Sequence, residues 1–234
     1  MQKYIVIADD LTGSNATCSL FKKIGLRAAS ILKLQGDRNY DVDVISYSTA
    51  SRGLDKEEAY KKVSEAIKIL KSQDILVYNK RIDSTLRGNI GVEINAMLDN
   101  LENDRIAVVV PAYPDSGRIV VNKTMLVNGV LLENSDAGKD PKTPIKTSCV
   151  EYLVQKDIKY SSTYFTLSDI VQPIEEIAKK IQEAIKKSRI LIFDAVNNED
   201  IIKISKAVIQ SEINIVTVDP GPFTLYYSRE LQKK

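Results

Sequence analysis

Residues 4–15 read Tyr-Ile-Val-Ile-Ala-Asp-Asp-Leu-Thr-Gly-Ser-Asn, so an apolar run ends in two adjacent carboxylates. A second apolar run, Ile75 to Tyr78, leads into residues 80–89, which read Lys-Arg-Ile-Asp-Ser-Thr-Leu-Arg-Gly-Asn. Short apolar runs of this kind are typical of strands buried inside a parallel sheet. Because the carboxyl ends of parallel strands share one edge, where ligands bind, we expect both polar stretches to face a common crevice.

The rest of the chain mostly alternates short apolar runs with segments of helical periodicity, which predicts an α/β fold with a predominantly parallel, Rossmann-like sheet flanked by helices. Strands are expected at residues 3–7, 26–34, 42–46, 75–78, 106–110, 190–193 and 213–218. Helices are expected from a cap at Thr12 or Ser14 to Ile24, and at residues 55–71, 89–101, 147–155, 174–187 and 200–210. A polar turn is expected at residues 36–39.

Residues 111–144 interrupt this alternation, because Pro, Gly and Asn recur through them. A turn-rich insertion of this length is usually functional, and Asn128-Gly129 predicts that it contains a hairpin. Near the end of the chain, residues 219–224 contain two prolines and a glycine and resemble a loop. We therefore expect one domain over residues 1–224, followed by a polar tail or linker over residues 225–234.

The composition excludes several classes of protein. Hydrophobic residues make up 44% of the 234 positions, and no apolar run approaches the roughly 20 residues that a bilayer requires. Lys and Arg number 33 against 31 Asp and Glu, so the near balance argues against a nucleic-acid partner. Two cysteines and no visible signal peptide favour a reducing, cytoplasmic location. The absence of His excludes a Ser-His-Asp triad, an imidazole base and a His-ligated metal, and we expect no metal site.

Asp9 and Asp10 are the first candidate ligand-binding residues. A carboxylate at a strand end can accept hydrogen bonds from ligand hydroxyls, coordinate Mg²⁺ or act as a base. It can equally cap the following helix, and both interpretations remain open. Thr12, Gly13 and Ser14 could let the backbone approach an anion at the helix N-terminus. Their spacing matches neither the dinucleotide-binding pattern nor the Walker pattern.

The second stretch is denser in polar groups. Arg87 could bind a carboxylate or phosphate through two hydrogen bonds, with Asp83 accepting hydroxyls or orienting Arg87, and with Lys80 just before them. Ser84 and Gly88 extend the anion-binding loop of residues 12–14. The alternative is an internal Asp-Arg pair that only fixes the loop.

Two further arginines lie in suggestive places. Arg118 follows Gly117 in the long insertion and is a second candidate for binding an anion, although a lone loop arginine is more often solvated. Arg52 ends the stretch Ser48 to Arg52, which follows the strand at 42–46 and adds hydroxyls and a cation near the same edge.

These motifs together resemble the four-carbon acid sugar kinase family, which includes threonate, erythronate and 3-oxo-tetronate kinases. The similar segments are Ile7 to Gly13, Ser51-Arg52, Lys80 to Gly91, Pro111 to Pro114 with Gly117-Arg118, Val127 to Gly129, Asp140-Pro141 and Asp219 to Phe223. The resemblance implies a substrate-binding amino-terminal domain of an ATP-dependent kinase. It implies that Asp9, Asp10, Arg87 and Arg118 bind the sugar acid, with Asp83 and Lys80 beside them.

The same resemblance implies ATP and Mg²⁺ as cofactors, both mainly on a carboxyl-terminal nucleotide domain that this chain lacks. That domain would act in cis or in trans, so this chain alone is not expected to phosphorylate efficiently. The expected partners are a small sugar acid, ATP and, as a candidate arrangement, a second copy in a homodimer, with no nucleic acid and no membrane. The chain departs from the family pattern at Ala16, where the family usually carries an Asp, which leaves the identity of the acid open.

Two other functions remain as alternatives. One is a non-catalytic module that senses a sugar acid or a nucleotide, which would bind its ligand without turnover. The other is a receiver-like or haloacid-dehalogenase-like phosphotransfer domain, suggested by paired Asp after the first strand. The dehalogenase type needs Asp-x-Asp, which Asp9-Asp10 does not supply, and a receiver would be far shorter.

Overall fold

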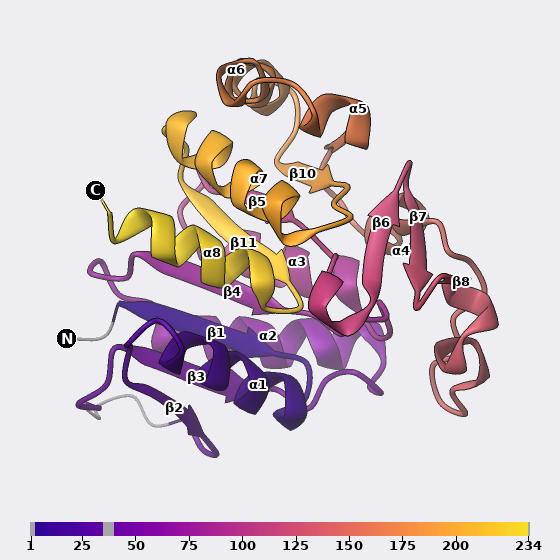
Figure 1. Cartoon of the computed structure of the whole chain (residues 1–234). Helices are drawn as coiled ribbons and strands as arrows, with labels where there is room; N and C mark the ends of the chain where they lie inside the picture. Colours follow the sequence, from indigo (N-terminus) through magenta and orange to yellow (C-terminus); the bar gives the residue numbers. More distant parts are fainter. Residues whose placement is uncertain (1–2, 35–39, 234) are drawn as a thin grey trace.

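The computed structural model describes residues 3–34 and 40–233, so the turn expected at residues 36–39 lies outside the described residues. Within them, eight parallel strands form one sheet in the order β2-β3-β1-β4-β11-β5-β10-β9 (Figure 1). The strands are β1 (Tyr4–Ala8), β2 (Ala28–Ile31), β3 (Val44–Ser48), β4 (Val77–Arg81), β5 (Ile106–Val109), β9 (Ser162–Phe165), β10 (Ile190–Phe193) and β11 (Ile215–Asp219). The predicted α/β fold with a mainly parallel sheet is confirmed.

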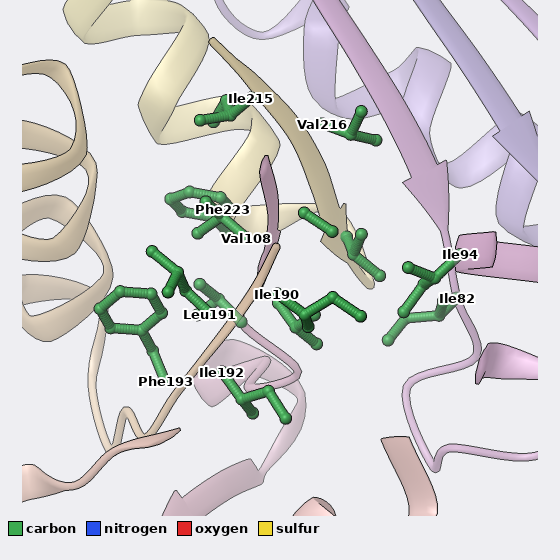
Figure 2. Packing of buried hydrophobic residues seen from close by; sticks show 14 of the residues in the cluster. Ile82, Ile94, Val108, Ile190, Leu191, Ile192, Phe193, Ile215, Val216 and Phe223 are labelled. Atoms are coloured by element: carbon green, nitrogen blue, oxygen red, sulfur yellow. The ribbon is translucent and has the colours of Figure 1, made fainter. Parts of the chain in front are cut away.

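The central strands are apolar because helices cover both faces of the sheet. Every residue of β1 and of β10 is buried. One face carries α1 (Leu11–Lys22), α6 (Ile174–Ile185), α7 (Asn198–Gln210) and α8 (Pro222–Leu231), and the other carries α2 (Lys56–Leu70) and α3 (Ile90–Asn100), against which α4 (Val150–Gln155) packs (Figure 1). In Figure 2, Val108 of β5 and Leu191 of β10 lie in one apolar cluster with Phe223 of α8.

The insertion forms a second, antiparallel sheet of β6 (Arg118–Val121), β7 (Thr124–Val127) and β8 (Val130–Leu131). Asn128 and Gly129 both have positive φ, 52° and 80°, as the predicted hairpin turn requires. Three short 3-10 turns flank the sheet, at Pro114–Ser116, Leu132–Asn134 and Asp136–Lys139. The sheet lies beyond the carboxyl ends of the parallel strands (Figure 1). It is tied there because the Val120 N–H donates to the Ala195 carbonyl at 2.9 Å, just past β10.

Three expectations about the elements were wrong, and two elements were missed. β4 continues through Arg81, so Lys80 belongs to the strand and not to the loop after it. β9 and the short helix α5 (Leu167–Ile170) were not predicted. The expected terminal loop and polar tail are instead largely helix α8, in which Tyr227 is only 6% exposed. α1 is capped by Asp10, not by Thr12 or Ser14. No helix in the described part of the chain has the length and apolar character to cross a membrane.

Candidate functional site

Three carboxylates surround the guanidinium group of Arg52 at the carboxyl edge of the sheet. Its Nε lies 2.6 Å from Asp9 Oδ2, its Nη1 2.8 Å from Asp10 Oδ2 and its Nη2 3.4 Å from Asp83 Oδ1. These residues follow β3, β1 and β4, which are adjacent in the sheet. The chain passes from β1 to β2 and β3 on one side and then to β4 on the other, so the cluster occupies the switch point where open α/β sheets bind ligands.

The two adjacent aspartates have different surroundings. Asp10 Oδ1 accepts the Gly13 N–H at 2.6 Å, so Asp10 caps α1 while its other oxygen binds Arg52. The cap interpretation of Asp10 is therefore confirmed, while ligand binding by Asp10 stays a prediction. Asp9 is 3% exposed, and its Oδ1 has no hydrogen-bond partner among the described residues. A buried acceptor without a donor is costly, so Asp9 is suited to receive a ligand hydroxyl.

Asp83 and Arg87 form a bidentate pair beside this cluster. Arg87 Nε donates to Asp83 Oδ2 at 2.7 Å and Nη2 donates to Asp83 Oδ1 at 3.0 Å. The third nitrogen, Nη1, donates to Asp140 Oδ2 at 2.8 Å. Asp140 in turn accepts the Thr143 N–H at 2.8 Å, so the pair connects the loop after β4 to the far end of the insertion. The internal Asp-Arg pair that the sequence left open is present, with Arg87 still 27% exposed.

The charges in the cluster stabilise one another. Burial alone would raise the pKa of Asp83, but hydrogen bonds from Arg87, the charge of Arg52 and the Thr85 hydroxyl lower the pKa of that carboxyl to about 2. Backbone N–H groups of Thr143 and Lys142 together with Arg87 lower the pKa of Asp140 to about 2. Burial would lower the pKa of Arg52, but its carboxylate neighbours raise it above its usual value. At neutral pH Asp83, Asp140 and Arg52 are therefore ionised.

The loop between Asp83 and α3 needs left-handed backbone at two positions. Leu86 has φ 58° and Gly88 has φ 96°. A Cβ on Gly88 would also lie 3.4 Å from the Cα of Arg52, in addition to the conformational strain. Gly88 therefore packs against Arg52, and its place in an anion-binding loop stays a prediction.

Lys80, expected to bind substrate, instead lies buried on β4 and supports the site from inside the protein. It is fully buried, and its ammonium group lies 2.8 Å from Glu93 Oε2 while donating to the carbonyls of Ile7 and Arg81 at 3.2 and 2.8 Å. Three acceptors use all three of its N–H donors. The partner Glu93 is 1% exposed and accepts a hydrogen bond from the Ser51 hydroxyl. The pair therefore anchors the residue that precedes Arg52.

The other expected residues divide similarly. Ser14 is buried and its hydroxyl bonds those of Ser30 and Ser46, both at 2.7 Å, so it is a core residue and not part of an anion loop. Thr12 is exposed on the first turn of α1, and Ser84 is partly exposed beside Asp83. Arg118 lies on β6 and donates to the Ser116 carbonyl, and in the described structure no ion pair joins it to the Arg52 cluster.

Two residues of the site were not among those selected from the sequence. Arg52 had been noted as a cation at the sheet edge, and its position after β3 was the signal. Asp140 lies 53 residues from Arg87, and only the Asp140-Pro141 motif pointed to it. The assembled site therefore consists of four aspartates and two arginines (Asp9, Asp10, Asp83, Asp140, Arg52, Arg87), which we call the Asp-Arg cluster.

The Asp-Arg cluster has capacity left for a polar anionic ligand. A guanidinium group has five N–H donors. Arg52 and Arg87 each use three of them in the contacts described above, so each has two N–H donors left for a ligand. Among the described residues no group of three or more His, Cys, Asp or Glu is arranged to hold a metal ion. The arrangement is suited to bind a small molecule that carries both a carboxylate and hydroxyls, because arginine binds the first and aspartate the second.

Comparison with known proteins relates this geometry to a family. The model of a family described as "Sugar-binding N-terminal domain" matches residues 4–227. A D-erythronate kinase of Heliobacterium modesticaldum is 41% identical over 230 residues, which are 96% of this chain and 52% of that protein. A D-threonate kinase of Salmonella typhimurium is 34% identical over 88% of this chain and 48% of that protein. The chain thus spans about half the length of these relatives.

Solved structures agree with the fold. A Haemophilus influenzae protein superposes with a TM-score of 0.84 at 27% identity, covering 98% of this chain and 57% of that one. A Bordetella bronchiseptica protein, crystallised as a domain-swapped dimer with bound citrate, has a TM-score of 0.81 at 26% identity and covers 97% of this chain and 57% of that one.

Proposed function

Because the chain belongs to the family of sugar-binding N-terminal domains, we propose that it is the acid-binding part of an ATP-dependent kinase that phosphorylates a four-carbon sugar acid. The observation that carries this proposal is the Asp-Arg cluster at the switch point of the sheet. A four-carbon sugar acid has one carboxylate and several hydroxyls, which match the free donors of the arginines and the free acceptors of the aspartates. The kinase names of the relatives support the same substrate class.

The residues of this chain would bind and orient the acid. Arg52 and Arg87 receive its carboxylate through their remaining N–H groups, and the unpartnered Oδ1 of Asp9 accepts a hydroxyl. Asp10 and Asp83 offer further acceptors on either side of Arg52. Phosphoryl transfer depends mainly on positioning and charge neutralisation, so a site of fixed charges that orients the acceptor hydroxyl contributes directly to the rate.

ATP and Mg²⁺ complete the proposal. Each aspartate of the Asp-Arg cluster already contacts an arginine, and among the described residues no group of three or more His, Cys, Asp or Glu is arranged to hold a metal ion, so in this proposal Mg²⁺ arrives with the nucleotide. We assign the nucleotide mainly to a carboxyl-terminal domain, supplied in cis or in trans. The acid-binding domain in this proposal extends through α8, because that helix packs on α7 and β11. The domain-swapped dimer of the Bordetella neighbour supports a homodimer, and its bound citrate supports recognition of hydroxy acids.

Calorimetry of this chain tests the proposal. Erythronate or threonate should bind with millimolar or tighter affinity, whereas erythritol, which has the hydroxyls but no carboxylate, should bind at least about tenfold more weakly because it loses a charge-assisted hydrogen bond. An Arg52→Lys variant keeps the charge but not the three-way contact, and it should also bind the acid more weakly. If the acids and erythritol bind equally, or if no acid binds, the proposal fails.

A further inference from the structure

A groove of about 440 Å³ opens next to the Asp-Arg cluster, and Arg52 forms part of its wall. The groove lies between the loop that follows β3, the loop that precedes α3, residues 142–147 and helix α4. Its size is within the usual range for small-molecule sites. Arg52 is thus shared between three carboxylates and the groove.

The charge of this groove is one-sided. Four cations line it, Arg52, Lys142, Lys146 and Lys156, and no Asp or Glu does. Each of four other cavities in the described chain contains lysine together with Asp or Glu. Since Arg52 already contacts three carboxylates, the three lysines supply the positive charge that concentrates anions in this groove.

The nearby acidic residues are already paired elsewhere. Asp157 is 2.6 Å from the ammonium of Lys56, and Glu151 is 2.7 Å from that of Lys123. In the described structure no ion pair involves the ammonium groups of Lys142, Lys146 or Lys156. The groove lysines therefore remain available to a ligand.

The wall that carries these lysines is held in place. Asp140 Oδ1 accepts the Lys142 N–H at 3.0 Å and the Thr143 N–H at 2.8 Å, while its Oδ2 binds Arg87 at 2.8 Å. Ile145 is buried and its N–H donates to the Ala137 carbonyl at 3.0 Å. On the opposite wall, the Asn89 amide donates to the Leu54 carbonyl at 3.0 Å. The backbone of the groove is therefore formed without a ligand.

We propose that this groove is a polyphosphate-binding site, separate from the acid-binding cluster and joined to it through Arg52. A single carboxylate needs one cation, whereas three unpaired lysines beside Arg52 suit a ligand with several negative charges. Lysine binds phosphate as a point charge and arginine binds it through its planar donors. Identifying the polyphosphate as the phosphoryl donor rests on the proposed function, but the anion site itself does not.

Inorganic triphosphate is the probe for the test. Calorimetry at low ionic strength should show that it binds to the intact chain and that added salt weakens binding. A triple variant, Lys142→Gln with Lys146→Gln and Lys156→Gln, should lose about tenfold or more in triphosphate affinity, because three exposed charge contacts each contribute severalfold. The matched control is Lys61→Gln with Lys68→Gln and Lys206→Gln, which removes the same charge from exposed lysines outside the groove.

The outcomes separate the two proposals. If the intact chain does not bind triphosphate, or if the triple variant and the control lose equal affinity, the groove inference is overturned. Erythronate binding to the same triple variant reports on the Asp-Arg cluster independently. If the triple variant keeps its acid binding and loses triphosphate binding, both proposals are supported. If the intact chain binds triphosphate but no acid, only the proposed function is overturned. ATP that binds more tightly than triphosphate assigns the site to a nucleotide, and equal affinities assign it to the phosphate chain alone; both support the inference.

Discussion

Replacing Lys80 with Met should strongly destabilise the fold, because it leaves the carboxylate of Glu93 buried without its cation. The two charged groups are 2.8 Å apart, with side chains 0% and 1% exposed. At an effective dielectric constant of about 20 their attraction is roughly 6 kcal/mol, and the desolvation of the two ions offsets much of it. Removing one partner of such a pair typically costs about 3–5 kcal/mol, a large part of the about 5–15 kcal/mol that stabilises an ordinary domain.

Urea denaturation followed by circular dichroism measures this effect. Lys80→Met should lower the free energy of unfolding by about 3–5 kcal/mol at pH 7, and the double variant with Glu93→Gln should regain a substantial part of that loss, because the amide is uncharged and can still accept the hydrogen bond from Ser51.

The pH dependence gives a second readout. Burial raises the pKa of Glu93 above its usual value, and removing Lys80 raises it further. Above a pH of about 4, the usual pKa of Glu, the folded Lys80→Met variant then binds more protons than its unfolded chain. Its stability should therefore fall as the pH rises above that value, and the double variant should not show this fall. Equal stability of Lys80→Met and the unsubstituted protein, or no recovery in the double variant, would refute this reasoning.

Three further predictions concern the site and its support. Arg87→Ala should reduce acid affinity by at least about tenfold with the far-ultraviolet circular dichroism unchanged, and unaltered calorimetric titrations would contradict the assigned role. The pKa values of Asp83 and Asp140 are about 2, below the value of about 4 for an unfolded chain, so the stability that these carboxylates contribute at neutral pH should be lost as the pH falls from about 4 to 2. In Asp83→Asn the free energy of unfolding should depend less steeply on pH across that window. An unchanged slope would count against this prediction. Gly91→Ala places a Cβ 2.1 Å from the carbonyl oxygen of Lys156, just after α4, and should lower the free energy of unfolding by about 1–3 kcal/mol in chemical denaturation. The control is Gly53→Ala, whose Cβ meets nothing within 4 Å. Equal stabilities of the two variants would show that α4 moves aside.

Much of the fold could be predicted because its signals are local. The apolar runs that form β1, β5 and β10 are short and bounded by polar residues, as is typical of strands buried on both faces. The Asn128-Gly129 turn was identified from two residues alone, because both must adopt positive φ.

The remaining elements depend on contacts between distant residues. The predicted strand stopped short of the true end of β4 because Asn79 and Lys80 are polar. Asn79 is nevertheless fully buried, and its amide donates a hydrogen bond of 2.9 Å to Asp219, 140 positions away. The buried carboxylate of Asp219 also accepts hydrogen bonds from the N–H groups of Gly221 and Thr224, at the start of α8. Pro220 and Pro222 had led to the prediction of a loop at this position. No local pattern reveals such partners.

The site shows the same division. Asp9, Asp10, Asp83 and Arg87 were predicted together because each follows a strand of the same sheet. The sequence could not tell that the cation at the centre is Arg52. Arg52 and Lys80 both lie near strand ends, and in the sequence either could bind a ligand. Only the structure shows that Lys80 is buried and paired with Glu93, whereas Arg52 is partly exposed at the site.

A crystal structure of the chain with the four-carbon acid that binds most tightly is the most direct test of the central claim. The Asp-Arg cluster predicts that the acid carboxylate lies about 3 Å from a guanidinium nitrogen of Arg52 or Arg87, with a hydroxyl donating to Asp9 Oδ1. An acid bound elsewhere on the molecule, with the cluster unchanged, would contradict the account.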